Sequence, residues 1–124
     1  MTITTILLVD DDGNYMNELE EFLVRNDFTV IKKNSTHKVL PFIKKNKPDL
    51  IILDYKINGM TGIDVSRILN NDPDTKDIPI MLVSNYHNSG SYEYKNNDSG
   101  IRIYLQKSSK PEVLLQEIRK IEIN

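Results

Sequence analysis

The sequence predicts a doubly wound α/β domain, with a five-stranded parallel sheet in the order 2-1-3-4-5 and helices on both faces. Two segments, residues 5–9 and 50–53, are short apolar runs without polar alternation. Such runs are typical of strands covered on both faces. Helical patterns alternate with strands along the chain, which favours parallel pairing through right-handed crossovers. The two most apolar strands are therefore expected at the centre of the sheet.

Composition indicates one ordinary globular domain. The chain has 124 residues, of which 39% are hydrophobic and 27% charged, and its net charge is −2. These values fit a single core and give no sign of a nucleic-acid or membrane footprint. Cysteine is absent, which excludes disulfides and thiolate metal sites. The N-terminus lacks a basic region before its short apolar run, so we expect no signal peptide, no membrane insertion and a cytoplasmic location.

Predicted strands and helices alternate along the first half of the chain, as a doubly wound fold requires. After the strand at 5–9, five apolar residues recur at helical spacing and predict a helix that ends near Asn26: Tyr15, Met16, Leu19, Phe22 and Leu23. Residues 28–33 predict a strand whose polar end suits a sheet edge. A second helix falls within 36–46, where Pro41 means that the helix either begins late or is kinked. The lysines near its end predict a solvated last turn.

The second half continues the pattern less evenly. A helix is expected at about 62–71, a loop at 72–77 and a strand at 78–83. Residues 86–100 are rich in Asn, Ser and Gly, so any helix there is expected to be short or weakly held. Residues 101–105 alternate, which predicts an edge strand with one exposed face. A final helix follows, with Pro111 in its first turn and Ser109 or Ser108 as its cap.

Polar side chains follow four of the predicted strands. Asp10-Asp11-Asp12 follows the first strand, Asp54 the third, Ser84 the fourth and Lys107 the fifth. Because the carboxyl ends of parallel strands share one edge of the sheet, these groups should meet in one crevice. Each has an ordinary explanation alone, such as a helix cap, a turn residue or a surface lysine. Their joint occurrence favours a common site.

Such a group is suited to phosphoryl transfer. Carboxylates in close quarters raise one another's pKa unless a cation is present, and hard oxygen ligands favour Mg²⁺. A lysine adds a positive charge for a phosphoryl oxygen, and a carboxylate can itself accept the phosphoryl group as an acyl phosphate.

Nearly the whole chain resembles the receiver domain of two-component response regulators, which has the flavodoxin-like fold. The resemblance rests on Ile-Leu-Leu-Val-Asp-Asp at 6–11, Pro-Asp-Leu-Ile-Ile-Leu-Asp at 48–54, Gly-Met-Thr-Gly at 59–62, Ile-Pro-Ile-Met-Leu-Val-Ser at 78–84 and Tyr-Leu-Gln-Lys at 104–107. It implies that the chain is a phosphoacceptor signalling module and not an enzyme with a separate substrate.

The resemblance also implies a role for each site residue. Asp54 matches the phosphoacceptor, and Lys107 matches the phosphate-binding lysine. Ser84 matches the switch hydroxyl and Tyr104 the switch aromatic. The resemblance implies four Mg²⁺ ligands: the carboxylates of Asp10, Asp11 and Asp54 and the backbone carbonyl of Lys56.

Several positions depart from the family pattern, among them Asn58 and the unusually polar segment 86–100, and two others adjoin the expected site. Ser108 follows Lys107 where the family usually has a proline after a cis bond, so either the bond is trans and Lys107 is aimed differently, or a strained bond is held. Asn85 replaces a usually small residue beside the switch hydroxyl and would narrow access to Asp54.

Two other interpretations stay open. The Asp10-Asp11-Asp12-Gly13 run fits the opening motif of a haloacid-dehalogenase-type phosphatase, with Asp10 as nucleophile and Asp12 as general acid. That family needs further acidic ligands after the lysine, which are found here only on the last helix, and Asp54 would have no role. The second interpretation is a pseudo-receiver, which acts as an interaction module without phosphorylation.

The resemblance implies partners as well. The phosphoryl donor would be a phosphohistidine on a sensor histidine kinase or a histidine phosphotransfer protein, and a downstream protein would bind the face from the 78–83 strand to the last helix. The same face could form a homodimer. We expect residues 1–124 to be a single receiver domain without an output domain, and therefore without direct nucleic-acid binding. His37 and His87 are expected at the surface.

Overall fold

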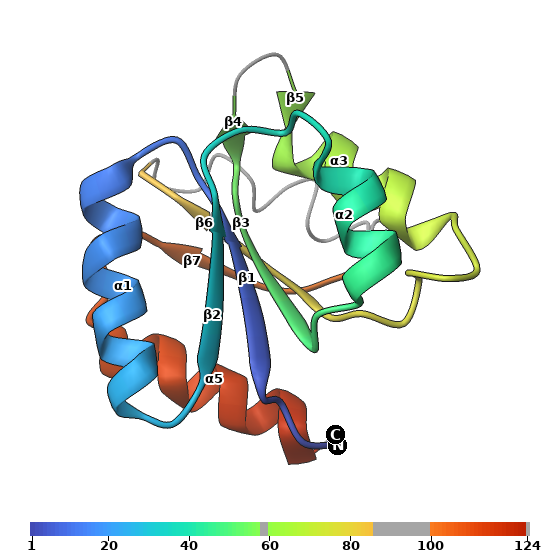
Figure 1. Cartoon of the computed structure of the whole chain (residues 1–124). Helices are drawn as coiled ribbons and strands as arrows, with labels where there is room; N and C mark the ends of the chain where they lie inside the picture. Colours follow the sequence, from blue (N-terminus) through green and yellow to red (C-terminus); the bar gives the residue numbers. More distant parts are fainter. Residues whose placement is uncertain (58–59, 86–99, 124) are drawn as a thin grey trace.

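A computed structural model describes residues 1–57, 60–85 and 100–123, and confirms the predicted sheet (Figure 1). Its five parallel strands are β1 (Thr5–Val9), β2 (Thr29–Lys33), β3 (Leu50–Asp54), β6 (Ile80–Ser84) and β7 (Ile101–Gln106). They are ordered β2-β1-β3-β6-β7, which is 2-1-3-4-5 among the strands of this sheet. Every residue of β3 and β6 is buried, as is all of β1 except Thr5, so the apolar runs occupy the middle of the sheet.

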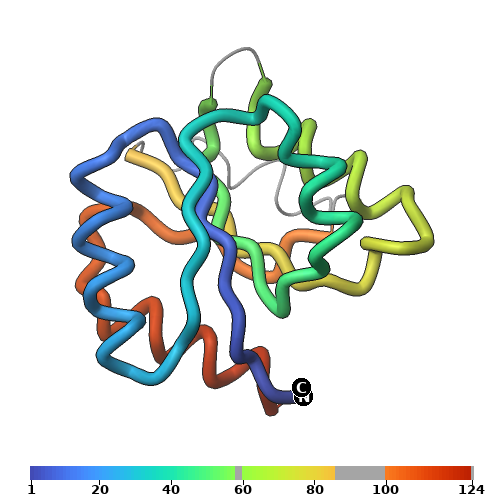
Figure 2. The backbone as a smooth tube through the Cα atoms, viewed as in Figure 1, coloured from blue at the N-terminus to red at the C-terminus, as the bar shows by residue number. Residues whose placement is uncertain are grey.

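Four helices in the described ranges cover the two faces of the sheet. In Figures 1 and 2, α1 (Gly13–Arg25) and α5 (Pro111–Ile123) lie on one side, and α2 (Val39–Asn46) and α3 (Gly62–Asn70) lie on the other. Each side has its own core, because alternate residues of the central strands point to opposite faces. Ile6 and Leu8 of β1 pack with α1 and α5, whereas Leu7 and Val9 pack with α2 and α3.

The edge strand β7 is irregular where it begins. Ile80 lies opposite Ile101 and Met81 lies opposite Ile103, so Arg102 is the extra residue of a β-bulge. The predicted position at an edge is confirmed. The predicted exposed face is wrong, since Arg102 is the one fully exposed residue and the four residues after it are half-buried. The bulge changes the alternation from which the exposed face was predicted.

Helix ends follow local sequence signals in most cases. α2 begins late, at Val39, so Pro41 lies in its first turn, and the last-turn lysines are exposed. α3 begins with a capping box, in which Thr61 and Asp64 each bond the other's backbone N–H. The predicted cap of α5 is wrong: the helix begins at Pro111, so Lys110 precedes it, and the Ser108 hydroxyl lies 3.3 Å from Gln106 Oε1 instead.

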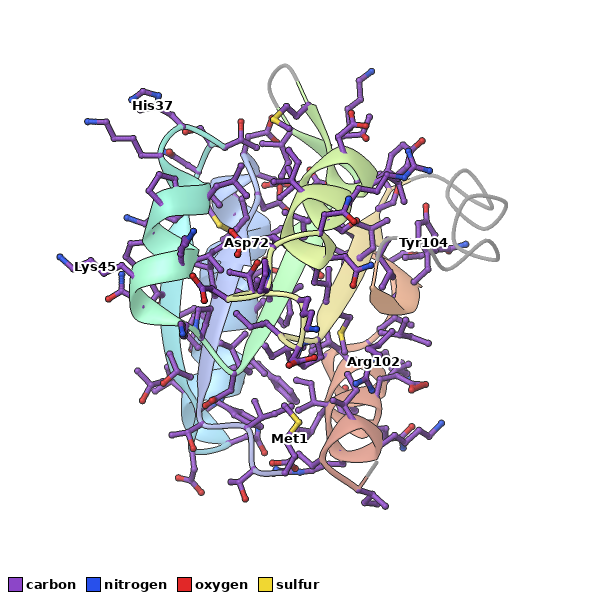
Figure 3. The ribbon with its side chains drawn as sticks, turned by 90° about the vertical axis from the view of Figure 1, so that its right-hand side faces the viewer. Met1, His37, Lys45, Asp72, Arg102 and Tyr104 are labelled. Atoms are coloured by element: carbon purple, nitrogen blue, oxygen red, sulfur yellow. The ribbon has the colours of Figure 1, made fainter. Side chains whose placement is uncertain are left out.

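A short hairpin of β4 (Lys56–Ile57) and β5 (Met60–Thr61), which the sequence did not indicate, follows β3. The expectations for residues 86–99, including His87 and a weak helix, lie outside the described residues. His37 is exposed as predicted, and Figure 3 shows it projecting outward, as does Lys45. None of the helices in the described ranges is long and apolar enough to span a membrane.

Candidate functional site

Two buried carboxylates meet at the carboxyl edge of the sheet. Asp10 follows β1 directly and Asp54 is the last residue of β3, which is the neighbouring strand. Only 2% of Asp10 and 7% of Asp54 is exposed, whereas Asp11 is exposed. One carboxylate oxygen from each of the three residues lies within 4.8 Å of the other two. The strand order thus brings together residues that are more than 40 positions apart in sequence.

Lys107 directly follows β7, and its side chain extends into this cluster. Its Nζ atom lies 2.9 Å from Oδ1 and 2.7 Å from Oδ2 of Asp10, and 3.5 Å from Oδ2 of Asp54. Every peptide bond in the described ranges is trans, including that between Lys107 and Ser108. The side chain nevertheless points into the acidic cluster, so the prediction that a trans bond would aim Lys107 elsewhere is wrong. Its backbone N–H donates to the carbonyl of Ser84 at 2.7 Å, which fixes its position relative to β6.

The beginning of α1 holds the acidic segment in place. Asp12 is the N-cap of this helix, and its Oδ1 accepts the backbone N–H of Tyr15 at 3.1 Å. The backbone N–H of Asp12 in turn donates to Oδ1 of Asp10 at 2.9 Å. Asp12 therefore serves as a helix cap, which was the ordinary explanation for this part of the acidic run.

Gly62 allows α3 to approach the end of β3 closely. Its N–H donates to the carbonyl of Tyr55 at 2.6 Å, next to Asp54. A Cβ atom on Gly62 would lie 2.5 Å from the Asp54 carbonyl oxygen and 2.5 Å from Cδ1 of Leu82. A side chain at this position would push the helix away from the end of β3. The sequence shows Gly62 only as part of a motif and does not reveal this contact.

The surroundings of Asp54 and Lys107 shift the pKa values of both groups. Burial, and then the neighbouring Asp10 carboxylate, raises the pKa of Asp54 from 3.8 to about 6, although Lys107 and the backbone N–H of Lys56 act in the opposite direction. Burial lowers the pKa of Lys107, but the hydrogen bond and charge of Asp10 outweigh burial, so the pKa is raised. The three acidic groups are thus only partly neutralised by one lysine.

Tyr15 is a site residue that sequence reasoning missed. It is half-buried, and the centre of its ring lies 4.9 Å from Nζ of Lys107. Burial, followed by the charges of Asp10, Asp54 and Asp12, raises the pKa of its phenol. The sequence indicated only the apolar side of a helix. Its place one turn after an acidic pair, at the start of that helix, is the signal that could have identified it.

The other residues that the sequence assigned to the site lie on or after β3, β6 and β7. Ser84 is the last residue of β6, the strand next to β3, and is 1% exposed. Asn85 is exposed, as is Lys56, whose backbone N–H bonds the Asp54 carboxylate. Tyr104 lies on β7, half-buried against the α2 and α3 side of the core (Figure 3).

The cluster suits a hard divalent cation. Its oxygen donors are carboxylates, which Mg²⁺ prefers to nitrogen or sulfur ligands. Oδ2 of Asp10 is buried and accepts no hydrogen bond from the described residues, although Nζ of Lys107 lies 2.7 Å away. Asp11 adds an exposed carboxylate on the open side. A cation there would supply the positive charge that one lysine does not provide.

The chain is similar to known proteins along most of its length. The chain is 28% identical over 121 residues to the phosphate regulon transcriptional regulatory protein PhoB of Pseudomonas aeruginosa, which covers 94% of this chain and 51% of PhoB. It thus spans about half the length of that relative. It is also 28% identical over 116 residues to Protein PilH of the same organism, covering 94% of this chain and 95% of PilH.

A solved structure has the same fold. The chemotaxis response regulator CheY4 of Vibrio cholerae superposes with a TM-score of 0.85 at 22% identity, covering 97% of this chain and 99% of that one. The family model of the response regulator receiver domain matches residues 6–119. This match contradicts the phosphatase interpretation, in which Asp12 would be a general acid. The chain therefore belongs to the response regulator receiver domain family of two-component signal transduction.

Proposed function

We propose that this receiver domain accepts a phosphoryl group on Asp54. The observation that supports this most strongly is the position of the Asp54 carboxylate, which is buried at the end of a central strand and has Lys107 Nζ at 3.5 Å. Phosphoryl transfer depends on positioning and charge neutralisation more than on a separate acid or base. Residues 1–124 would act as one receiver unit in this role.

In the proposed step, an oxygen of Asp54 attacks the phosphorus of a phosphohistidine. The new P–O bond forms as the P–N bond breaks, and the departing imidazole nitrogen takes up a proton. Lys107 would turn from its ion pair with Asp10 toward the incoming phosphoryl oxygens, which requires only a small movement because Asp10 and Asp54 already flank its Nζ. Mg²⁺ bound by the Asp10, Asp11 and Asp54 carboxylates and the Lys56 carbonyl would supply further positive charge to those oxygens.

Phosphorylation would then be communicated through β6 and β7. It adds a charge of about −1.5 to −2 at the edge of the sheet, where Ser84 offers a hydroxyl and Lys107 an ammonium group. The main chains of these two residues are already joined by a 2.7 Å hydrogen bond. A movement of either would therefore affect both strands, and the half-buried Tyr104 on β7 would follow.

The partners follow from this chemistry. The phosphoryl donor would be a sensor histidine kinase or a histidine phosphotransfer protein. A downstream protein, or a second copy of the chain, would bind the face formed by β6, β7 and α5. No direct contact with nucleic acid is proposed for residues 1–124, whose net charge is −2.

The proposal is tested by labelling with acetyl phosphate and Mg²⁺, read by intact mass. Wild type should gain one phosphoryl group, and the gain should disappear in Asp54→Ala or after chelation of Mg²⁺. Asp77→Asn is the matched control, because Asp77 is an exposed aspartate outside the site and its loss should leave labelling unchanged. Absence of label on folded wild type would contradict the proposal and favour a pseudo-receiver that acts without phosphorylation.

A further inference from the structure

The aromatic ring of Tyr15 lies against the ammonium group of Lys107. Lys107 Nζ is 4.9 Å from the centre of this ring, and only 6% of the Lys107 side chain is exposed. A cation at this distance from an aromatic face is attracted by the ring quadrupole, and the attraction is stronger when water is excluded. Tyr15 thus acts on the same ammonium group that is paired with Asp10.

The position of Tyr15 is coupled to the acidic segment by the backbone. Its N–H donates to Asp12 Oδ1 at 3.1 Å, and the Asp12 N–H donates to Asp10 Oδ1 at 2.9 Å. The same Asp10 oxygen accepts from Lys107 Nζ at 2.9 Å. Asp10, Asp12, Tyr15 and Lys107 therefore form a closed ring of contacts, in which moving the aromatic ring changes the surroundings of the cation.

Tyr15 and Lys107 both border a cleft. This cleft, of about 100 Å³, runs between α1 and the start of α5, and both Tyr15 and Lys107 line it, together with Glu18, Gln106 and Leu114. Loss of the ring would extend the cleft toward Nζ and admit water. The ammonium group would then be better hydrated and less firmly held toward Asp10 and Asp54.

We propose that Tyr15 is a positioning residue for Lys107. Its ring holds the ammonium group in a water-poor position from which it can meet a phosphoryl group on Asp54. This inference rests on the proposed function, because Lys107 has a phosphoryl group to meet only if Asp54 accepts one. Tyr15 acts through Lys107 and needs no contact with the phosphoryl donor.

The first test compares labelling rates with acetyl phosphate at saturating Mg²⁺. Tyr15→Leu, which removes the aromatic face and keeps an apolar side chain, should slow labelling about three- to tenfold. Tyr15→Phe keeps the face and should label at the wild-type rate. Phe22→Leu is the matched control, since Phe22 is a half-buried aromatic on the same helix that packs against the core, and it should also label at the wild-type rate. A wild-type rate in Tyr15→Leu would overturn the inference.

The second test asks whether Tyr15 acts through Lys107. In a Lys107→Ala background, Tyr15→Leu should slow labelling no further, because the cation that it positions is gone. An equal slowing in both backgrounds would show a general structural role and overturn the inference. Should Tyr15→Leu fail to fold, Tyr15→Met provides the same comparison with a more adaptable side chain.

An NMR measurement separates this inference from the proposed function. The ε-methylene protons of Lys107 should be shifted upfield by the ring in wild type and in Tyr15→Phe, and should return to ordinary values in Tyr15→Leu. This readout needs no phosphorylation. Ordinary shifts in wild type would overturn the positioning role even if Asp54 is labelled, whereas upfield shifts in a protein that takes no label would contradict the proposed function alone.

Discussion

Replacing Asp54 with asparagine should stabilise the folded domain at neutral pH. Burial and the Asp10 carboxylate raise the pKa of Asp54 from 3.8 to about 6, so its charged form is disfavoured in the folded state by about two pKa units. Since one unit corresponds to about 1.36 kcal/mol, the penalty is at most about 3 kcal/mol. Asparagine has nearly the same shape and no charge. Since the cluster opens to solvent at Asp11 and solvent screens part of the repulsion, we expect Asp54→Asn to raise the free energy of unfolding at pH 7 by about 1–3 kcal/mol.

The pH dependence of this gain has a defined sign. Between the unfolded pKa of 3.8 and the folded pKa of about 6, the folded state binds more protons at Asp54 than the unfolded state does. The contribution of Asp54 to stability therefore falls as pH rises through this window, and the full penalty is present above it. The advantage of Asp54→Asn should shrink to below about 1 kcal/mol at pH 4, where Asp54 in the folded wild type is already protonated.

The assay is urea unfolding at pH 7 and at pH 4, with a chelator present to remove divalent cations. Thermal unfolding of the two proteins at pH 7 should show a rise in Tm of about 4–12 °C. Asp77→Asn, which removes an exposed carboxylate, is the control and should change stability by less than about 0.5 kcal/mol. Equal stability of wild type and Asp54→Asn at pH 7, or an advantage that is undiminished at pH 4, would refute the reasoning.

Three further substitutions test other parts of the site. Gly62→Ala should cost about 1–3 kcal/mol, because its Cβ would lie 2.5 Å from a backbone oxygen, whereas Gly13→Ala, with no atom within 4 Å of its Cβ, should be neutral or slightly stabilising in the same urea assay. Asp12→Ala should cost about 1 kcal/mol through loss of the α1 cap and still accept label from acetyl phosphate, whereas loss of labelling would restore a chemical role for its carboxylate. Lys107→Ala should slow labelling about tenfold or more, and an unchanged rate would show that the 3.5 Å contact with Asp54 has no part in transfer.

The fold could be predicted because its strands carry unambiguous patterns. Residues 5–9 and 50–53 are apolar almost throughout, which is typical of a strand covered on both faces. At β7 the same reasoning failed. A one-residue bulge at Arg102 alters which side chains face the protein, and no local pattern in the sequence marks it.

The site could be predicted only in part. Asp10, Asp54 and Lys107 each follow a strand, so topology alone brings them to one edge. Gly62 and Tyr15 act through distances between elements, namely a helix end against β3 and a ring against Lys107. Such distances depend on how the helices pack on the sheet, and a single sequence does not reveal them. The expectation that a trans Lys107–Ser108 bond would aim Lys107 differently failed for the same reason.

The central claim is that Asp54, and no other carboxylate, carries the phosphoryl group. The most direct measurement is to label the protein with acetyl phosphate and Mg²⁺, reduce the acyl phosphate with borohydride, and locate the resulting homoserine by peptide mass spectrometry. The account predicts homoserine at position 54 alone. Homoserine at position 10 would contradict it, because the nucleophile would then be the carboxylate that is ion-paired with Lys107 at 2.7 Å.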